Sequence, residues 1–239
     1  MLRLRVKAPF GSFRHFTAGS YRPTAPFITP SAAYGLVLNL AGIESRLDDG
    51  RSAMTLMRTD LPAVDIALGA VVFPEVQTMY QQLHNYPVGD TGKEHRPSCK
   101  GAKYNIQPIR REFLSGIDAY ICLRNNAPLE ETVRRALKSS AEFAESGLRR
   151  YGVPFLGDNN FVIDRVEEEA KPEKPAFWYR KVQPSEKELI RGRCRLTSWI
   201  DRTDMSCTAA ALYAPIVEPE RNPPAEAWTR VPPPRINDC

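Results

Sequence analysis

The first 43 residues constrain the fold most, because they carry the patterns of a strand, a long loop and a buried helix in that order. Leu2, Leu4 and Val6 alternate with three basic residues, and this period of two is typical of a β-strand with one apolar face. If the apolar face meets helices, the three cations lie on the open face of the sheet. The stretch contains five basic side chains and no carboxylate, so it indicates an anionic partner.

The loop after this strand is basic and aromatic, with Arg14, Tyr21 and Arg22 among its residues. A loop of this length usually holds a ligand. Arginines contact phosphates, and Phe13 and Tyr21 can stack on unpaired bases. The loop therefore favours a nucleic-acid partner. The alternative interpretations are a solvated edge strand, ordinary surface charges and, for Phe13, packing in the core.

A helix is predicted to begin at Thr29 and to continue to about Ile43. Thr29 can cap this helix, Pro30 suits the first helical position, and small residues from Ser31 onward fill the first turn. The apolar residues follow helical spacing on nearly all sides, so most of the helix is expected in the core. Free N–H groups at its start attract phosphate, which makes Thr29 and Ser31 candidates for RNA contact.

The middle of the chain predicts further strands and a second helix. The expected elements are strands over 66–73, 104–124 and 161–166, a long loop or hairpin tip over 84–103, and a helix over 129–148. Asn126 can cap that helix, and the strand over 104–124 is expected to be interrupted near Ser115 and Gly116. The order strand, helix, strand, inserted hairpin, strand, helix, strand predicts an α+β fold with a ferredoxin-like βαββαβ core.

Composition narrows the class of protein. The net charge of +5 and the pI near 9.0 favour a polyanionic partner. Five widely spaced cysteines without a CxxC motif predict neither a zinc site nor a disulfide framework, and they fit a reducing cytoplasm. No apolar run approaches 18 residues, so no membrane span is expected, and no cofactor-binding motif is present.

The sequence contains no hydrolase, kinase or dinucleotide-binding motif. A ribonuclease without a metal needs only a base for the ribose 2′-OH, an acid for the leaving group and a cation for the phosphorane. Tyr21 or Tyr34, His95, and Lys93 or Lys100 could supply these groups. These residues are not gathered in one motif, and we predict no catalytic and no metal-binding residue.

The N-terminal residues resemble a known family. The short strand followed by G-S-F-R and then S-Y-R-P-T-A-P-F-I-T-P-S-A-A-Y-G-L-V-L-N-L-A-G is similar to the N-terminal signature of the CRISPR-associated Cas-five family, part of the RAMP superfamily. The stretches REFLSGIDAYICL (111–123) and YGVPFLGDNNFVI (151–163) resemble later segments of that family in the same order. Together the three segments lie within about the first two thirds of the chain.

The resemblance implies a subunit of a type I Cascade surveillance complex, of a I-B-like subtype without nuclease activity. It implies a RAMP-type core over 1–170 with an inserted thumb hairpin over about 75–103, a small strand-rich C-terminal extension over 176–214 and a Pro-rich, mostly irregular tail over 215–239. Such members hold the 5′ handle of the CRISPR RNA and contact backbone and large subunits, so that target DNA is reached indirectly through the complex.

By the same resemblance, the loop and helix start would grip the handle, the thumb would follow the guide, and a pair of arginines would flank it. The residues predicted to bind RNA are Ser12, Phe13, Arg14, Tyr21, Arg22, Thr29, Ser31, Lys100, Lys103, Arg110 and Arg111.

Two other functions stay open at this point. One subtype of the family cleaves repeat RNA with a Tyr, Lys and His set, so a metal-independent CRISPR-repeat endoribonuclease is the first alternative. The adjacent Lys-His pair of that subtype is missing here, where Lys93 and His95 are separated by a glutamate. The second alternative is a general RNA-binding ferredoxin-like module, although the aromatic RNP motifs of the RRM type are absent.

Overall fold

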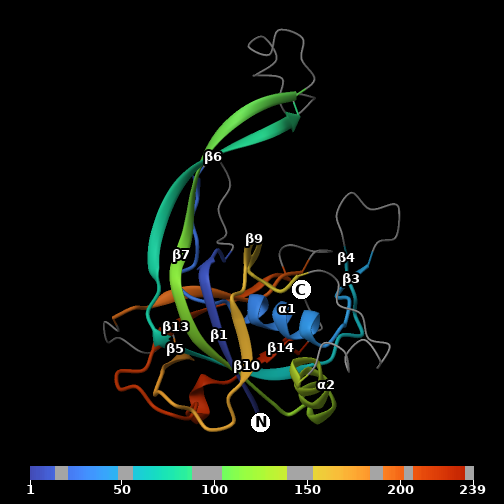
Figure 1. Cartoon of the computed structure of the whole chain (residues 1–239), viewed down its shortest axis with the longest axis vertical. Helices are drawn as coiled ribbons and strands as arrows, with labels where there is room; N and C mark the ends of the chain where they lie inside the picture. The colour runs from blue at the N-terminus through green and yellow to red at the C-terminus, as the bar shows by residue number, and fades with distance from the viewer. Residues whose placement is uncertain are drawn as a thin grey trace.

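A computed structural model describes residues 1–13, 21–47, 56–87, 104–138, 153–183, 191–201 and 207–234 (Figure 1). At 83–87 and 104–107 the description covers the backbone alone. The fold is α+β, as predicted: a large sheet carries helices α1 (Pro30–Leu40) and α2 (Ala127–Lys138) on one side. Neither helix is long and apolar enough to cross a membrane, and the same holds for every described helix.

The described residues form one ten-stranded sheet with the order β10-β1-β7-β5-β11-β13-β12. Strands β2 and β6 also pair with β7, and β14 pairs with β5. The strands are β1 (Leu2–Gly11), β2 (Tyr21–Arg22), β5 (Val64–Val72), β6 (Glu75–Pro87), β7 (Tyr104–Arg124), β10 (Arg165–Glu168), β11 (Phe177–Lys181), β12 (Cys194–Trp199), β13 (Ala209–Pro215) and β14 (Thr229–Val231). Two small hairpins, β3 (Arg46–Leu47) with β4 (Leu56–Met57) and β8 (Phe155–Leu156) with β9 (Asp158–Val162), lie outside it.

The core lies between the sheet and the helices. Leu2, Leu4 and Val6 are fully buried on the helix side of β1, as the alternation predicted. Helix α1 contributes six buried residues to the same core. Its start is also as expected, because the Thr29 Oγ1 accepts a hydrogen bond from the backbone N–H of Ala32 at 3.2 Å.

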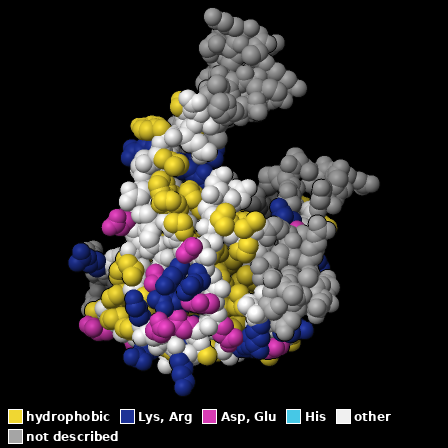
Figure 2. Space-filling view, in the orientation of Figure 1, with side chains coloured by type: hydrophobic (Ala, Val, Ile, Leu, Met, Phe, Trp, Pro, Cys, Tyr) yellow, Lys and Arg dark blue, Asp and Glu magenta, His cyan; other side chains and the backbone are white. Residues whose placement is uncertain are grey.

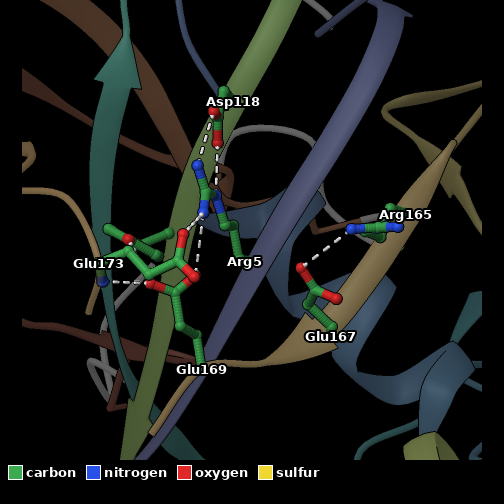
Figure 3. Close-up of polar contacts among 7 residues, drawn as sticks. Arg5, Asp118, Arg165, Glu167, Glu169 and Glu173 are labelled. Atoms are coloured by element: carbon green, nitrogen blue, oxygen red, sulfur yellow. Dashed lines mark hydrogen bonds and ion pairs between the residues drawn. The ribbon is translucent and has the colours of Figure 1, made fainter. Parts of the chain in front are cut away.

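The opposite face of β1 is closed, and the expectation that its cations lie on an open face is wrong for two of them. Arg3 is 2 % exposed and Arg5 is 5 % exposed. The Arg5 guanidinium lies among three carboxylates: it donates to Asp118 at 3.0 and 3.1 Å, to Glu169 at 3.3 Å and to Glu173 at 3.1 Å (Figure 3). Segments distant in sequence therefore cover cations that the local pattern places at the surface.

The C-terminal segment covers the rest of this face and belongs to the sheet. Residues 215–239 were expected to be mostly irregular, yet β14 pairs with the edge of β5. The Asn222 side chain accepts a hydrogen bond from Arg3 at 2.7 Å. The Arg124 guanidinium lies over the Trp228 ring, 4.1 Å from the centroid of that ring. The Trp178 Nε1–H donates to the Glu220 carbonyl at 2.9 Å. Strand pairing and these side-chain contacts together hold the segment on the sheet.

A two-stranded ribbon projects from this body (Figure 1). Strand β6 pairs antiparallel with β7 from Glu75 opposite Ser115 to Pro87 opposite Tyr104. Strand β7 is continuous over 21 residues instead of being interrupted, but Gly116 has a φ of 71° at the expected place. At this glycine β7 changes partner, from β5 in the body to β6 in the ribbon. The long loop or hairpin tip predicted over 84–103 begins later than predicted, because β6 continues to Pro87, and the remaining segment 88–103 lies outside the described residues.

Two predicted boundaries need correction. The strand expected over 161–166 is wrong as a single element, because β9 ends at Val162 and pairs with β8, whereas β10 begins at Arg165 and pairs with β1. Helix α2 begins at Ala127, earlier than predicted, and is described as far as Lys138. Its predicted cap is confirmed, since the Asn126 Oδ1 accepts from the Leu129 N–H at 3.0 Å. The predicted continuation to 148 lies outside the described residues.

Candidate nucleic-acid interface

The base of the ribbon brings the N-terminal loop next to strand β7. Strand β2 pairs parallel with β7, so that Tyr21 lies opposite Arg110 and Arg22 lies opposite Arg111. The Arg110 guanidinium lies 5.3 Å from the centroid of the Tyr21 ring, within the range of a cation–π contact. Tyr21 is 43 % exposed. Two predicted residues that are almost 90 positions apart in sequence therefore share one exposed surface.

Tyr80 on β6 extends this surface, and the sequence analysis missed it. It lies directly opposite Arg110 in the β6–β7 register, and residues directly opposite one another in an antiparallel pair have side chains on the same face. Tyr80 is 81 % exposed. We call Tyr21, Arg110 and Tyr80 the ribbon-base surface. Locating Tyr80 from sequence required the exact register across the ribbon, which the intervening residues 88–103 do not reveal.

The Glu112 carboxylate holds Tyr21 in place at the ribbon-base surface. The Tyr21 hydroxyl donates to the Glu112 carboxylate, which also accepts from the Thr24 backbone N–H at 3.2 Å. The hydrogen bond to Glu112 raises the pKa of the Tyr21 phenol above its ordinary value. The hydroxyl is engaged as a donor to Glu112, and the partly exposed ring is the group that Tyr21 offers to a ligand.

Arg111 points to the other face of the ribbon and is engaged there. It is 8 % exposed, forms an ion pair with Asp158, donates to Gln81 at 3.4 Å and lies 5.2 Å from the centroid of the Phe161 ring. Burial would raise the pKa of Asp158, but hydrogen bonds from the Asn160 backbone and from Arg111 outweigh it and hold the pKa below its usual value. Arg111 thus fastens β9 to the ribbon.

Other predicted contact residues have partners within the protein. Phe13 is fully buried in the core, so its ring is not available for stacking in this structure. The Ser12 hydroxyl donates to the Glu112 carbonyl at 3.2 Å. Thr29 caps α1, and its hydroxyl lies 3.1 Å from that of Ser31, which is partly exposed. Three further predicted residues, Arg14, Lys100 and Lys103, lie outside the described residues.

The nuclease groups weighed from sequence are not assembled among the described residues. Tyr34 is 2 % exposed and donates to the Pro62 carbonyl at 2.8 Å, and burial raises the pKa of this phenol above its usual value. His95, Lys93 and Lys100 lie outside the described part of the chain. In that part, no group of three His, Cys, Asp or Glu side chains could hold a metal ion.

Apolar side chains are exposed on the ribbon and at the end of β1. Figure 2 shows hydrophobic side chains gathered along the ribbon and on the body beneath it. On β6, Val76 is 50 % exposed and Met79 is 40 % exposed, and on β1, Phe10 is 44 % exposed. The Phe10 ring packs edge-on against Phe113 with centroids 5.3 Å apart. Exposed apolar residues this close to a cationic and aromatic surface are typical of a protein that works in contact with other macromolecules.

The fold and this surface define an α+β protein with one large antiparallel sheet, a projecting ribbon and a cationic, aromatic surface at the base of that ribbon. A family model described as CRISPR-associated protein (Cas_Cas5) matches residues 1–211, and the chain belongs to this family. The family indicated by the N-terminal residues is thereby confirmed.

One solved structure shares the fold at low sequence identity. A chain of a structure titled "CRISPR RNA-guided surveillance complex" is 13 % identical with a TM-score of 0.54, and the match covers 95 % of each chain. A second, titled "Crystal structure of Cas protein", is 16 % identical with a TM-score of 0.48 and covers 93 % of this chain and 99 % of the other. The comparison with curated proteins gave no match.

Proposed function

We propose that this chain is an RNA-binding subunit of a type I CRISPR Cascade surveillance complex and that it caps the 5′ handle of the CRISPR RNA. Membership of the CRISPR-associated family supports the complex, and the shared fold of a chain in an RNA-guided surveillance complex is consistent with it. The ribbon-base surface carries the proposal, because Tyr21, Arg110 and Tyr80 offer two exposed rings with a cation between them.

The chemistry of this surface suits single-stranded RNA. An unpaired base exposes a π-face that stacks on tyrosine, and stacking of this kind is tolerant of sequence. An arginine at the same place can contact the adjoining phosphate, and the exposed Arg22 follows Tyr21 on β2, opposite Arg111. A double helix would bury its bases away from both rings. The surface therefore favours an unpaired handle over a duplex.

The finer fold assignment is part of the proposal. Strands β1, β5, β7 and β10 with α1 and α2 follow one another as βαββαβ, and their order in the sheet is β10-β1-β7-β5 with antiparallel neighbours. This supports a ferredoxin-like, RAMP-type core, with the β6–β7 ribbon as the thumb inserted between its second and third strands.

The partners proposed for the chain are the backbone and large subunits, with target DNA reached through the complex. The exposed apolar residues Val76 and Met79 on the ribbon support a protein contact there, because a ribbon of this kind buries little apolar surface against its own domain. A cytoplasmic location is consistent with the free thiols of Cys122, Cys194 and Cys207.

We further propose that the chain binds RNA without cleaving it. The Tyr21 phenol is held protonated by Glu112, and Tyr34 is buried, so neither tyrosine is suited to activate a ribose 2′-OH. Purified protein should leave repeat RNA intact in EDTA and in magnesium. Specific cleavage that is lost on substituting His95→Ala would overturn this part and assign the chain to the endoribonucleases.

The binding proposal is tested with handle RNA and a salt series. Replacing Arg110→Ala together with Arg22→Ala should weaken binding by the full chain about tenfold or more and reduce the slope of log K against log salt, because counterion release follows phosphate contacts. Arg230→Ala is the matched control, since this arginine is 42 % exposed on β14 and pairs with Asp65. Binding that is insensitive to salt and unchanged in the double variant would refute the proposal.

A further inference from the structure

A pocket of about 380 Å³ lies along one face of α1, on the helix side of the sheet. Ser31, Gly35 and Asn39 line it from α1, and because they are four residues apart they lie on one face of the helix. Phe155 and Gly157, at the turn between β8 and β9, line it as well. The volume falls in the range of sites for small ligands, and a single nucleobase is smaller than this space.

Two glycines line the pocket and have different roles. Gly35 is exposed, and a Cβ added there would meet nothing within 4 Å. Because glycine lowers helix stability relative to alanine, its presence in α1 has a cost that packing does not explain. Gly157 has a φ of 79°, and a Cβ there would lie 2.2 Å from the Ser12 carbonyl oxygen. This close approach holds the Phe155 turn against the end of β1.

The walls combine an aromatic ring with polar groups, of which the Asn39 amide oxygen has no partner among the described residues. Phe155 is 40 % exposed. The Asn39 Oδ1 is buried without a hydrogen-bond partner among the described residues, although Asn39 lines the pocket. An unpaired amide oxygen is costly, and a rotation of the side chain toward a ligand with N–H donors would relieve that cost. The Thr29 and Ser31 hydroxyls stand at the start of the same helix.

Glu112 connects this pocket to the ribbon-base surface. It accepts from the Tyr21 hydroxyl and from the Thr24 N–H, and the Thr24 hydroxyl accepts from the N–H of Phe13, which lines the pocket, at 2.9 Å. A strand of RNA held at Tyr21 and Arg110 therefore has the pocket as a neighbouring site, reached past Glu112, Thr24 and Phe13. An apolar peptide side chain would fit the walls but would leave the Asn39 amide unpaired.

We propose that this pocket receives one unpaired nucleobase of the bound RNA, stacked on Phe155 with its polar edge toward Asn39. The inference rests on the proposed function and adds a base-specific subsite to it. The α1 face thus reads one position of the handle, whereas the ribbon-base surface binds the strand irrespective of sequence. Recognition of base edges by an asparagine amide and stacking on an aromatic ring are the means by which proteins read single-stranded RNA.

The test is an abasic scan of handle RNA against matched variants of the full chain. Wild type should lose about tenfold in affinity at one abasic position and little at the others. Gly35→Leu, which fills the pocket, should lose about tenfold on intact RNA and should show no further loss at that position. Gly35→Ala adds one methyl group in open space and is the control, with less than a twofold change expected.

A loss of RNA affinity in Gly35→Leu is not expected to come from unfolding of the variant. Leucine is a better helix former than glycine and meets open space here, so Gly35→Leu should melt no lower than wild type. If Gly35→Leu does melt at a lower temperature, Phe155→Ala replaces it in the abasic scan and should show the same loss of RNA affinity. Removing this ring should destabilise the fold little, because it is 40 % exposed.

Three outcomes overturn the inference, and one of them also overturns the proposed function. The base pocket is refuted if no abasic position weakens binding by wild type, or if Gly35→Leu loses the same affinity on every RNA, abasic or intact. In either case, RNA binding that still depends on Arg110 preserves the proposed function. Unchanged RNA affinity with weaker co-purification of protein partners assigns the pocket to a peptide. If wild type binds no handle RNA, both proposals fall together.

Discussion

The back face of β1 and the base of the ribbon both carry arginine, but their surroundings are opposite. Arg5 is enclosed by Asp118, Glu169 and Glu173, whereas Arg110 contacts one exposed ring and lies across from another. The same charge is therefore a structural element in one region and an exposed group, which we propose binds RNA, in the other. The difference is set by which later segments of the chain pack over each strand, and not by the strands themselves.

The largest expected effect is on the enclosed side. Arg5→Ala leaves the half-buried Asp118 and Glu169 without their cation, so the free energy of unfolding should fall by about 3 kcal/mol. Denaturant unfolding measures it. Arg165→Ala is the control, because Arg165 and Glu167 form an exposed ion pair at 3.6 Å (Figure 3) and should contribute less than about 1 kcal/mol. If both variants lose the same small amount of unfolding free energy, the enclosed Arg5 contributes no more to stability than the exposed Arg165.

The next effect is on the open side and concerns RNA alone. Tyr80→Ala should weaken binding to handle RNA by about 1 to 3 kcal/mol, because a stacking surface for one base is lost. Tyr80→Phe keeps the ring and should bind like wild type. Neither change should lower the melting temperature, since this side chain is 81 % exposed. A weakened Tyr80→Phe would attribute the contact to the hydroxyl group and contradict stacking.

The smallest effect is the contribution of the enclosed side to the pH dependence of stability. Burial would raise the pKa of Glu169, but hydrogen bonds from the Glu173 backbone and Tyr120, and the charge of Arg5, hold it below the ordinary value of 4.5. A carboxylate with a depressed pKa in the folded state stabilises the protein above the unfolded pKa, and this stability is lost as the pH falls through the folded pKa.

The unfolding free energy of wild type should therefore decrease as the pH is lowered from about 5 to 3, and that of Arg5→Ala should decrease less. Urea unfolding at each pH gives both curves. Parallel curves for the two proteins would show that Arg5 does not set the protonation of this cluster.

Sequence reasoning located elements whose signals are local. The alternation of Leu2, Leu4 and Val6, the Thr29 cap and the Asn126 cap each depend on residues within a few positions of one another, and all three are present. Gly116 was also recognised as a break in the pattern, although the structure uses it as a bend in a continuous strand.

The rest depended on contacts between distant segments. The burial of Arg3 and Arg5 follows from residues 169–173 and from Asn222, more than 160 positions away, and no local pattern reveals such a cover. Of the predicted contact residues, Tyr21 and Arg110 are brought together, whereas Phe13 is in the core and Arg111 is paired with Asp158. Tyr80 was missed because its position opposite Arg110 depends on the register of the ribbon.

The continuity of β7 gives the ribbon a mechanical property. A 21-residue strand spans roughly 70 Å, and here one end is stapled into the centre of the body between β1 and β5 while the other end stands in the ribbon. The ribbon would bend at Gly116, where β7 changes its partner from β5 to β6. We expect a molecule that pulls on the ribbon to displace the middle of the sheet beside Tyr21, so that a contact on the ribbon and RNA binding at its base would influence each other through one strand.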